Sequence, residues 1–141
     1  PETIVSATFS KLDPYIYKGE EHYYQLDFYP IRNLPANGFI RLILSNSAKF
    51  GLSPYCYSTH LLPHVAELGI LCTVENPTTL KIYNLAALTA GVMERVRLRI
   101  FSDIVTSGSS FRPAVTIQTH YSINADPSIV DLLTNHQLNT N

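Results

Sequence analysis

The sequence has little charge, and the charge that it has is balanced. Charged residues make up 15% of the 141 residues, with ten Lys and Arg against eleven Asp and Glu, for a net charge of -1. An average soluble domain contains about 25% charged residues. Phosphate backbones and anionic lipid surfaces bind clusters of positive charge, and the sequence contains no run of either sign. We therefore expect neither nucleic acid nor a membrane surface as a partner.

Long apolar runs and a signal peptide are also missing. No stretch approaches the roughly 18 consecutive apolar residues of a membrane span, and the best run, residues 39–44, is interrupted by Arg41. The chain begins with Pro1 rather than Met, so we expect a processed or excised piece of a longer protein. With 45% hydrophobic residues in 141, the chain is long enough to bury a core and short enough to form one domain.

The motifs of common catalytic sites are absent from the sequence. It has no G-x-S-x-G nucleophile motif and no G-x-G-x-x-G phosphate loop, and its six glycines are dispersed. The adjacent carboxylates Glu20 and Glu21 follow a glycine, where solvated surface is the expected environment. The Asp residues are too scattered to define a calcium site. We therefore expect no enzyme, no catalytic residues, no metal and no cofactor.

The chain has two cysteines, Cys56 and Cys72, with fifteen residues between them. Together with His60 and His64 they form a C-x3-H-x3-H-x7-C arrangement, which offers four potential zinc ligands. This spacing is not a standard one, and Pro63 opposes a helix that would present both histidines on one face. We favour a disulfide between Cys56 and Cys72 and a secreted or cell-surface location, with a zinc site as the alternative.

Two-residue alternation dominates the chain, and Val, Ile, Thr, Tyr and Phe are common in the alternating runs. Turn signals such as Pro35-Ala36-Asn37-Gly38 and Glu75-Asn76-Pro77 separate these runs at regular intervals. The pattern predicts an all-β domain, either a sandwich or a barrel, of about eight or nine strands. The expected strands are residues 3–10, 22–29, 39–45, 53–58, 69–74, 80–84, 94–102 and 115–123, with 15–17 as a further short edge strand.

Two of these strands divide their residues cleanly between a core face and an outer face. The apolar faces carry Tyr24, Leu26, Phe28, Val96, Leu98 and Ile100, and the opposite faces carry Tyr23, Gln25, Asp27, Tyr29, Arg95, Arg97 and Arg99. A solvated outer face accounts for the three arginines, and a docking surface for acidic or carbohydrate groups is the alternative. The tyrosine-rich face suits contact with a neighbouring domain or a glycan, because tyrosine buries apolar area and keeps a polar tip.

The C-terminal segment, residues 125–141, differs from the rest of the chain. Its residues Ala125-Asp126-Pro127-Ser128 precede Ile129, Val130, Leu132 and Leu133. This pattern is typical either of a capped, short amphipathic helix or of a strand that leaves the domain, and both alternatives stay open. An extended segment would pair with the open sheet edge of another subunit. We therefore place the sandwich at residues 1–124 and expect residues 125–141 to be a tail that links subunits.

Several segments, taken in order, resemble one recurrent extracellular domain. They are Leu34-Pro35-Ala36-Asn37-Gly38-Phe39-Ile40-Arg41-Leu42, Cys56, Gly69-Ile70-Leu71-Cys72-Thr73-Val74, Leu80-Lys81-Ile82-Tyr83, Ala90-Gly91 and the strand 96–100. The domain occurs in large secreted and cell-surface proteins of ciliates and algae, including proteins similar to those of flagellar mastigonemes. The resemblance covers residues 5–123 and departs from the pattern after Ile100. It implies an immunoglobulin-like, antiparallel β-sandwich used as a building block, with the paired cysteines bridging neighbouring strands or loops.

These observations favour a structural protein, a subunit of an extracellular filament or surface coat that binds copies of itself head to tail. Neutral faces cost little desolvation when they are buried, and a head-to-tail contact propagates. The alternative is a secreted adhesion or carbohydrate-binding module with glycans as partners, for which Tyr55, Tyr57 and His60 are the first residues to test. The expected interface residues are Tyr23, Tyr29, Arg95, Arg97, Arg99, Ile129, Val130, Leu132 and Leu133.

Overall fold

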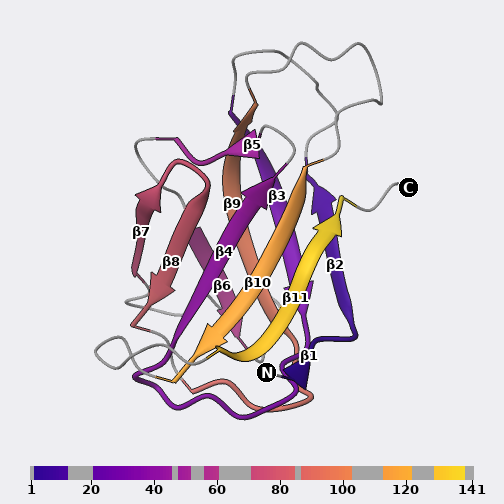
Figure 1. The fold of residues 1–141 in the computed structure, drawn as a ribbon, viewed down its shortest axis with the longest axis vertical. Helices are drawn as coiled ribbons and strands as arrows, with labels where there is room; N and C mark the ends of the chain where they lie inside the picture. Colours follow the sequence, from indigo (N-terminus) through magenta and orange to yellow (C-terminus); the bar gives the residue numbers. More distant parts are fainter. Residues whose placement is uncertain are drawn as a thin grey trace.

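The structure, a computed structural model, is an all-β sandwich of two packed sheets (Figure 1). It describes residues 2–12, 21–45, 48–51, 56–60, 71–84, 87–102, 113–121 and 129–138, without the side chains of residues 21, 56–60, 101 and 102. Within these ranges eleven strands and no helix occur, so no helix there is long and apolar enough to cross a membrane. The expected β-sandwich is confirmed.

One sheet has six strands in the order β1-β11-β10-β4-β8-β7. Its neighbouring strands are antiparallel except for β1, which runs parallel to β11. The strands are β1 (Glu2–Thr3), β4 (Phe39–Ser45), β7 (Leu71–Asn76), β8 (Thr79–Tyr83), β10 (Ala114–His120) and β11 (Ile129–Gln137).

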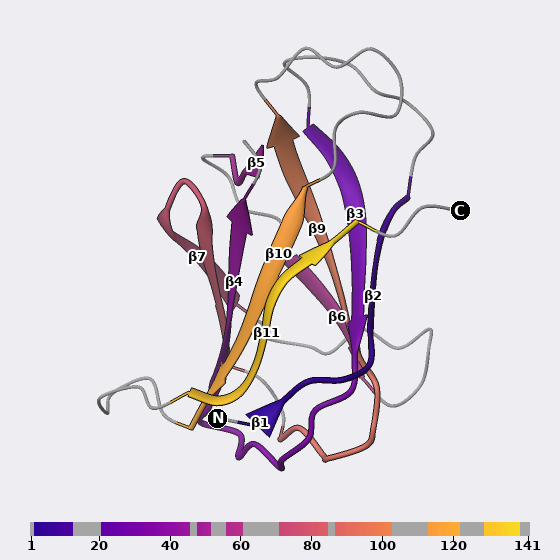
Figure 2. The same cartoon turned by 45° about the vertical axis from the view of Figure 1, so that its right-hand side comes forward.

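The second sheet has five strands in the order β2-β3-β9-β5, and β6 also pairs with β9. Strands β5 and β6 pair with different stretches of β9, the first near its end and the second near its beginning. The turned view in Figure 2 shows this sheet behind the six-stranded one. The strands are β2 (Ala7–Lys11), β3 (Glu21–Phe28), β5 (Ala48–Lys49), β6 (Cys56–His60) and β9 (Glu94–Ser102).

The core lies between the two sheets and is filled by alternate residues of their strands. In β3 and β9 the residues expected on the apolar face are all buried, which confirms the predicted faces. Burial of each such side chain contributes about 1.5–3 kcal/mol relative to leaving it exposed. The largest fully buried side chains of the core are Phe9, Phe28, Ile4, Leu26, Ile40, Leu42, Leu80, Ile82, Leu88, Leu98 and Ile100, and Phe39 is buried as well but lies outside the core cluster.

The single strand expected at residues 3–10 is divided between the two sheets. Strand β1 pairs with β11 in the six-stranded sheet, whereas β2 pairs with β3 in the other. Ile4 lies between them, fully buried, and its N–H donates to the Leu132 carbonyl at 2.9 Å. Because this one expected strand forms two, it explains part of the difference between the eight or nine strands expected and the eleven observed in the described residues. The edge strand expected at residues 15–17 lies outside the described residues.

Residues 129–137 are an integral strand of the sandwich, which corrects the predicted tail. Strand β11 pairs with β10 on one side and with β1 on the other, and Val130 is buried in the core. The domain boundary at residue 124 is therefore wrong, because it would remove core residues. Of the two alternatives for this segment the extended one is correct, and its pairing is with strands of the same chain.

Two bulges in β11 explain its misleading sequence pattern. Between the pairs Gln118↔Leu132 and His120↔Ile129, β11 has one residue more than β10, and the same occurs between Val115↔His136 and Ile117↔Leu133. An extra residue shifts the alternation of a strand, so neighbouring positions can face the same side. The adjacent residues Val130 and Asp131 are accordingly both buried. The apolar spacing that suggests a helix is that of a bulged strand.

Candidate functional site

The outer face of the five-stranded sheet brings together most of the predicted interface residues. Strands β3 and β9 are antiparallel neighbours, and their outward residues lie directly opposite one another. These pairs are Tyr23↔Arg99, Gln25↔Arg97 and Asp27↔Arg95. Tyr29 follows β3 at the next outward position. We call this set of seven residues the Tyr/Arg face.

Hydrogen bonds across the strands hold the polar part of the Tyr/Arg face in place. Arg95 donates to Asp27 from Nε to Oδ1 at 2.8 Å and from Nη2 to Oδ2 at 3.0 Å. Arg97 Nε donates to Gln25 Oε1 at 3.1 Å. The hydrogen bond to Asp27 raises the pKa of the Arg95 guanidinium above its ordinary value. The bidentate geometry fixes both side chains and makes this pair stronger than a single surface contact.

Aromatic side chains mark the two ends of this face. Tyr23 is 45% exposed and lies opposite Arg99, which is half-buried. Tyr29 is 41% exposed, and its N–H donates to the Ser6 carbonyl at 3.1 Å. Tyrosine and arginine are the side chains that are enriched in protein interfaces. The face is therefore rich in the two residue types that protein interfaces favour.

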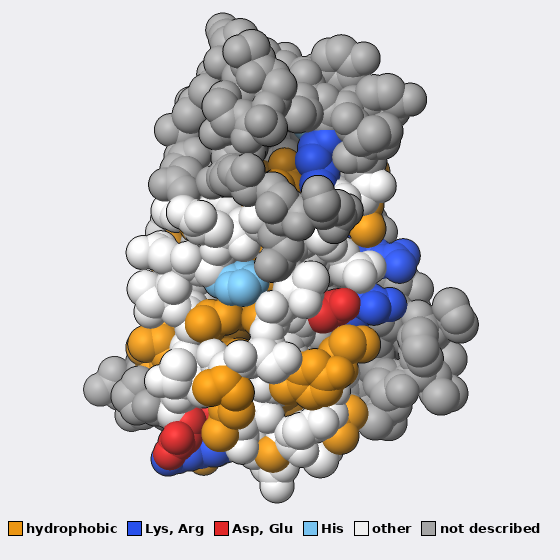
Figure 3. All heavy atoms as spheres, turned by 90° about the vertical axis from the view of Figure 1, so that its right-hand side faces the viewer, with side chains coloured by type: hydrophobic (Ala, Val, Ile, Leu, Met, Phe, Trp, Pro, Cys, Tyr) orange, Lys and Arg blue, Asp and Glu red, His pale blue; other side chains and the backbone are white. Residues whose placement is uncertain are grey.

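The predicted interface residues of the C-terminal segment do not join the Tyr/Arg face. Ile129, Val130, Leu132 and Leu133 belong to β11 in the other sheet, and Val130 is only 2% exposed. Strand β11 lies beside β2 at the edge of the sandwich. In Figure 3, which looks at this side of the molecule, the side chains of Lys, Arg, Asp and Glu cover only a small part of the described surface.

Cys72 lies on β7, half-buried against the core, and is disulfide-bonded. No free cysteine occurs in the described part of the chain. The zinc alternative needs Cys72 as a thiolate, which a disulfide prevents, and no metal-ligating group of three or more residues occurs among the described side chains. The side chain of Cys56 lies outside the description, so its pairing with Cys72 stays a prediction.

For the other candidate zinc ligands and glycan-binding residues, the structure describes the backbone at most. His64 and Tyr55 lie outside the described residues. Tyr57 and His60 belong to β6, of which the structure describes only the backbone. Backbone pairing places Tyr57 opposite Arg97, on the sheet that carries the Tyr/Arg face.

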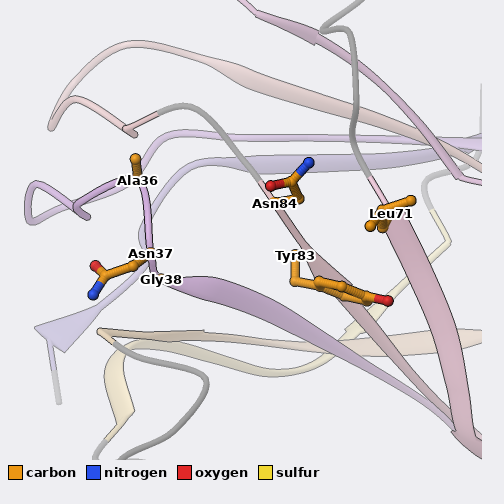
Figure 4. Close-up of a pocket in the computed structure, with 6 residues that line it drawn as sticks. All are labelled: Ala36, Asn37, Gly38, Leu71, Tyr83 and Asn84. Carbon is orange, nitrogen blue, oxygen red and sulfur yellow. The ribbon is translucent and has the colours of Figure 1, made fainter.

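A pocket at one end of the sandwich was not expected from the sequence. It encloses about 460 Å³ between the turn that precedes β4 and the neighbouring ends of β7 and β8 (Figure 4). We call it the end pocket. Its elements are separate in the sequence, so the expected turn at Pro35–Gly38 and the expected strand at residues 80–84 gave no sign of their proximity. The lining residues are Ala36, Asn37, Gly38, Leu71, Tyr83 and Asn84.

Two residues fix the backbone around the end pocket. A side chain at Gly38 would place its Cβ 2.6 Å from the His120 carbonyl oxygen and 2.7 Å from Leu34 Cγ. Only glycine therefore lets the turn approach β10 this closely. Asn84, at the end of β8, has a φ of 59°, in the left-handed region that Asn and Gly adopt most readily.

An aromatic cluster lies beside the end pocket on the outer face of the six-stranded sheet. The Phe39 and His120 rings stack with centroids 4.5 Å apart, at directly opposite positions of β4 and β10. Lys81 Nζ lies 4.7 Å from the Phe39 centroid and 5.9 Å from the Tyr83 centroid. The ammonium group is thus drawn over two rings by cation–π attraction.

A salt bridge completes this cluster. Arg41 donates to Glu75 from Nε at 2.7 Å and from Nη2 at 3.1 Å. The hydrogen bond from Arg41 lowers the pKa of the Glu75 carboxyl below its ordinary value, against an opposing effect of desolvation. The two side chains are 22% and 32% exposed, so solvent screens the pair and its contribution to stability is small.

Comparisons with known proteins find matches among solved structures. No protein-family model matches it, and no curated protein matches it either. A structure of AvmM, which catalyses macrocyclization in alchivemycin A biosynthesis, is similar with a TM-score of 0.46 and 10% identity, over 100% of this chain and 91% of AvmM. The pilus backbone protein RrgB from Streptococcus pneumoniae is similar with a TM-score of 0.42 and 15% identity, over 86% of this chain and 33% of RrgB.

These likenesses are too weak to carry a conclusion about function. The chain spans about a third of the length of RrgB, so its likeness there concerns one part of a longer protein. The resemblance to the mastigoneme-like extracellular domain stays a prediction, because no family model matches.

Proposed function

We propose that this protein is a structural subunit of an extracellular filament or coat and that it binds copies of itself through the Tyr/Arg face. The observation that carries the proposal is a row of hydrogen bonds between the side chains of β3 and β9, with an exposed tyrosine at each end of the row. Side chains that are already ordered lose less entropy on binding. Arg95 and Arg97 keep their partners when the face is covered, so burial leaves fewer unsatisfied polar groups.

The charge of the Tyr/Arg face favours contact with a different surface of the next copy. The face carries three arginines and one carboxylate, whereas the whole chain has a net charge of -1. The remainder of the chain is therefore net negative. Two identical faces would repel each other, while a positive face against a negative surface attracts. A contact between unlike surfaces is heterologous, and heterologous contacts propagate into filaments.

Strand β11 takes no part in the proposed contact. Its residues already pair with β10 and β1, and its two bulges interrupt the row of hydrogen-bonding groups that an incoming strand would need. The proposed assembly therefore rests on sheet faces and not on exchanged termini.

The disulfide at Cys72 supports the extracellular location. Disulfides persist in oxidising compartments and are rare in reducing ones. The low charge of the chain also fits close packing of subunits, since few charges would lose water when neutral surfaces meet.

Two tyrosines of similar exposure allow a matched test of this proposal. Tyr23 lies on the Tyr/Arg face and is 45% exposed, and Tyr121 lies off it and is 49% exposed. Sedimentation velocity over a range of concentrations would measure self-association of the wild type, Tyr23→Ser and Tyr121→Ser. We expect Tyr23→Ser to weaken association about tenfold or more, as truncation of an interface anchor does, and Tyr121→Ser to leave it unchanged.

The salt dependence of association adds a second readout. Attraction between a positive face and a negative surface weakens as salt screens it, so wild-type association should fall as ionic strength rises. A wild type that stays monomeric at every concentration, or two variants that associate equally well, would contradict the proposal.

A further inference from the structure

We propose that the end pocket binds an apolar monocarboxylate, a small molecule with a hydrocarbon body and one carboxylate. The proposal goes beyond self-association, because the end pocket belongs to the six-stranded sheet and the Tyr/Arg face to the other. The volume of the pocket, about 460 Å³, falls within the range of roughly 300–1,000 Å³ that small-molecule sites occupy.

One wall of the end pocket is apolar and accessible. Leu71 and Tyr83 lie at directly opposite positions of β7 and β8, and Figure 4 shows their side chains close to each other. Leu71 is 48% exposed, although it is a large aliphatic residue, and Tyr83 is half-buried. A hydrocarbon body that covers this wall gains free energy from the apolar area that both surfaces bury.

The two carboxamides of the lining add no polar group to this wall. Figure 4 shows the Asn37 amide pointing away from the side chains of Leu71 and Tyr83, and Asn84 already interacts within the chain. The other two lining residues, from the turn, are an alanine and a glycine, which have no polar side chain. The lining therefore suits an apolar body.

A positive charge lies beside the apolar wall. Lys81 precedes Tyr83 by two positions on β8, so both side chains are on the same face of the sheet. Lys81 Nζ lies 5.9 Å from the centroid of the Tyr83 ring and 4.7 Å from that of the Phe39 ring, and cation–π attraction holds it there. Within the part of the chain that the structure describes, this ammonium group makes no hydrogen bond and no salt bridge. Its three N–H donors are therefore available to a ligand.

The charges around Lys81 leave one positive charge that is not paired. Lys81 acts on the Glu75 carboxylate through space, but the hydrogen bond from Arg41 has the larger effect in lowering the pKa of Glu75. Arg41 and Glu75 form a salt bridge, so their charges cancel. The His120 ring is stacked on Phe39 and only 1% exposed, so it presents no charge to the pocket. One carboxylate balances the remaining charge, whereas a doubly charged anion would keep one charge without a counter-ion, which costs free energy.

The apolar wall and the ammonium group together orient the ligand. Its hydrocarbon body lies against Leu71 and Tyr83, and its carboxylate accepts hydrogen bonds from Lys81 Nζ. Because the ammonium group is already held over two rings, little side-chain entropy is lost on binding. Lys81 is half-buried, so water and salt screen this ion pair in part.

Two pairs of small molecules test the proposal. Hexanoate and phenylacetate carry the carboxylate, and hexanamide and phenylacetamide have the same bodies without the charge. Each is titrated into the isotope-labelled protein and followed by backbone amide NMR. We expect the two acids to shift the signals of Gly38, Leu71 and Tyr83 and to leave those of the Tyr/Arg face in place. The amides should bind about fivefold more weakly, since they lack one partly exposed ion pair.

Three lysine variants separate the effect of the charge from other effects. Lys81→Gln removes the charge and keeps most of the stem, Lys81→Arg keeps the charge, and Lys49→Gln removes a lysine of β5 in the other sheet. We expect Lys81→Gln to weaken binding of the acids about fivefold and to leave binding of the amides unchanged. Lys81→Arg and Lys49→Gln should bind the acids as the wild type does. Added salt should weaken wild-type binding of the acids and not of the amides.

Four results would overturn the proposal. The first is that neither acid shifts the signals of the end pocket. The second is that each amide binds as tightly as its acid, and the third is that Lys81→Gln binds the acids as tightly as the wild type. The fourth is that the same signals shift when the protein is concentrated without any ligand, because a second copy then occupies the pocket.

Discussion

The Asp131 carboxylate on β11 accepts a hydrogen bond from the backbone N–H of Ile31 at 2.9 Å, although the two residues lie 100 positions apart. The same oxygen, Oδ2, accepts from the N–H of Arg32 at 3.1 Å. Asp131 is fully buried. The residue therefore ties the loop after β3, in one sheet, to β11 in the other, and it gives β11 a structural role in closing the sandwich.

Replacing this carboxylate should destabilise the whole domain. Asp131→Ala leaves two backbone N–H groups without their acceptor, and hydrogen bonds to a charged group are each worth about 1.5–3 kcal/mol. We expect a loss of about 3 kcal/mol in the free energy of unfolding, measured by urea denaturation. Asp131→Asn keeps one acceptor oxygen and should lose less. An alanine variant as stable as the wild type would show that the two hydrogen bonds contribute nothing.

The buried face of a strand is predicted best from the sequence where the strand has no bulge. In β3 and β9 every second residue enters the core, so the faces of Tyr24 and Leu98 follow from alternation alone. In β11 two bulges shift that alternation, and the adjacent residues Val130 and Asp131 are both buried. A bulge depends on how two strands pair, and pairing is a tertiary property that periodicity along one segment does not contain.

A second prediction concerns the close approach at Gly38. A methyl group there would lie 2.6 Å from a backbone oxygen of His120, which cannot move as a flexible side chain can. Overpacking of this kind costs about 1–3 kcal/mol. We expect Gly38→Ala to lower stability by that amount in urea denaturation, and Ala36→Ser, in the exposed part of the same turn, to have almost no effect. Equal stability of both variants would mean that the turn moves away from β10 without cost.

The candidate site was predictable in part. Alternation places Asp27 and Arg95 on outer faces, but the residues are 68 positions apart and nothing local in the sequence sets them opposite each other. That requires the register of β3 against β9. The end pocket was missed for the same reason, because Asn37 and Asn84 come from separate elements that meet only after the sheet has formed.

A third prediction concerns the salt bridge between Arg41 and Glu75, which should make the stability of the protein depend slightly on pH. The pKa of Glu75 is lowered from its ordinary value of 4.5 in the folded state, so the pair stabilises the protein above that value. The contribution is lost as the pH falls through the folded-state pKa. Because the pair is partly exposed, it should amount to less than about 1 kcal/mol.

Unfolding of the wild type and Glu75→Gln measures this effect across the acidic range. The wild type should be the more stable protein near neutral pH, and the difference should vanish at low pH and shrink in high salt. In an Arg41→Gln background the Glu75 substitution should have a smaller effect, from the weaker interactions of Glu75 with Lys81 and His120. A difference between the wild type and Glu75→Gln that persists at low pH would assign the effect to packing instead of charge.

The last prediction is the pairing of Cys72 with Cys56. Cys72 is disulfide-bonded, and Cys56 is the other cysteine of the chain. A bond that closes a loop with fifteen residues between its ends should stabilise the fold by about 3 kcal/mol. Intact mass under non-reducing conditions should lie two hydrogens below the reduced mass. If the two cysteines bond to each other, Cys56→Ser, Cys72→Ser and the double variant should lose similar stability, because each change removes the same bond. Additive losses of stability, or a Cys56 thiol that reacts with an alkylating reagent in the folded protein, would contradict the pairing. A protein that loses stability when a chelator is added, and not when a reductant is added, would favour the zinc site instead.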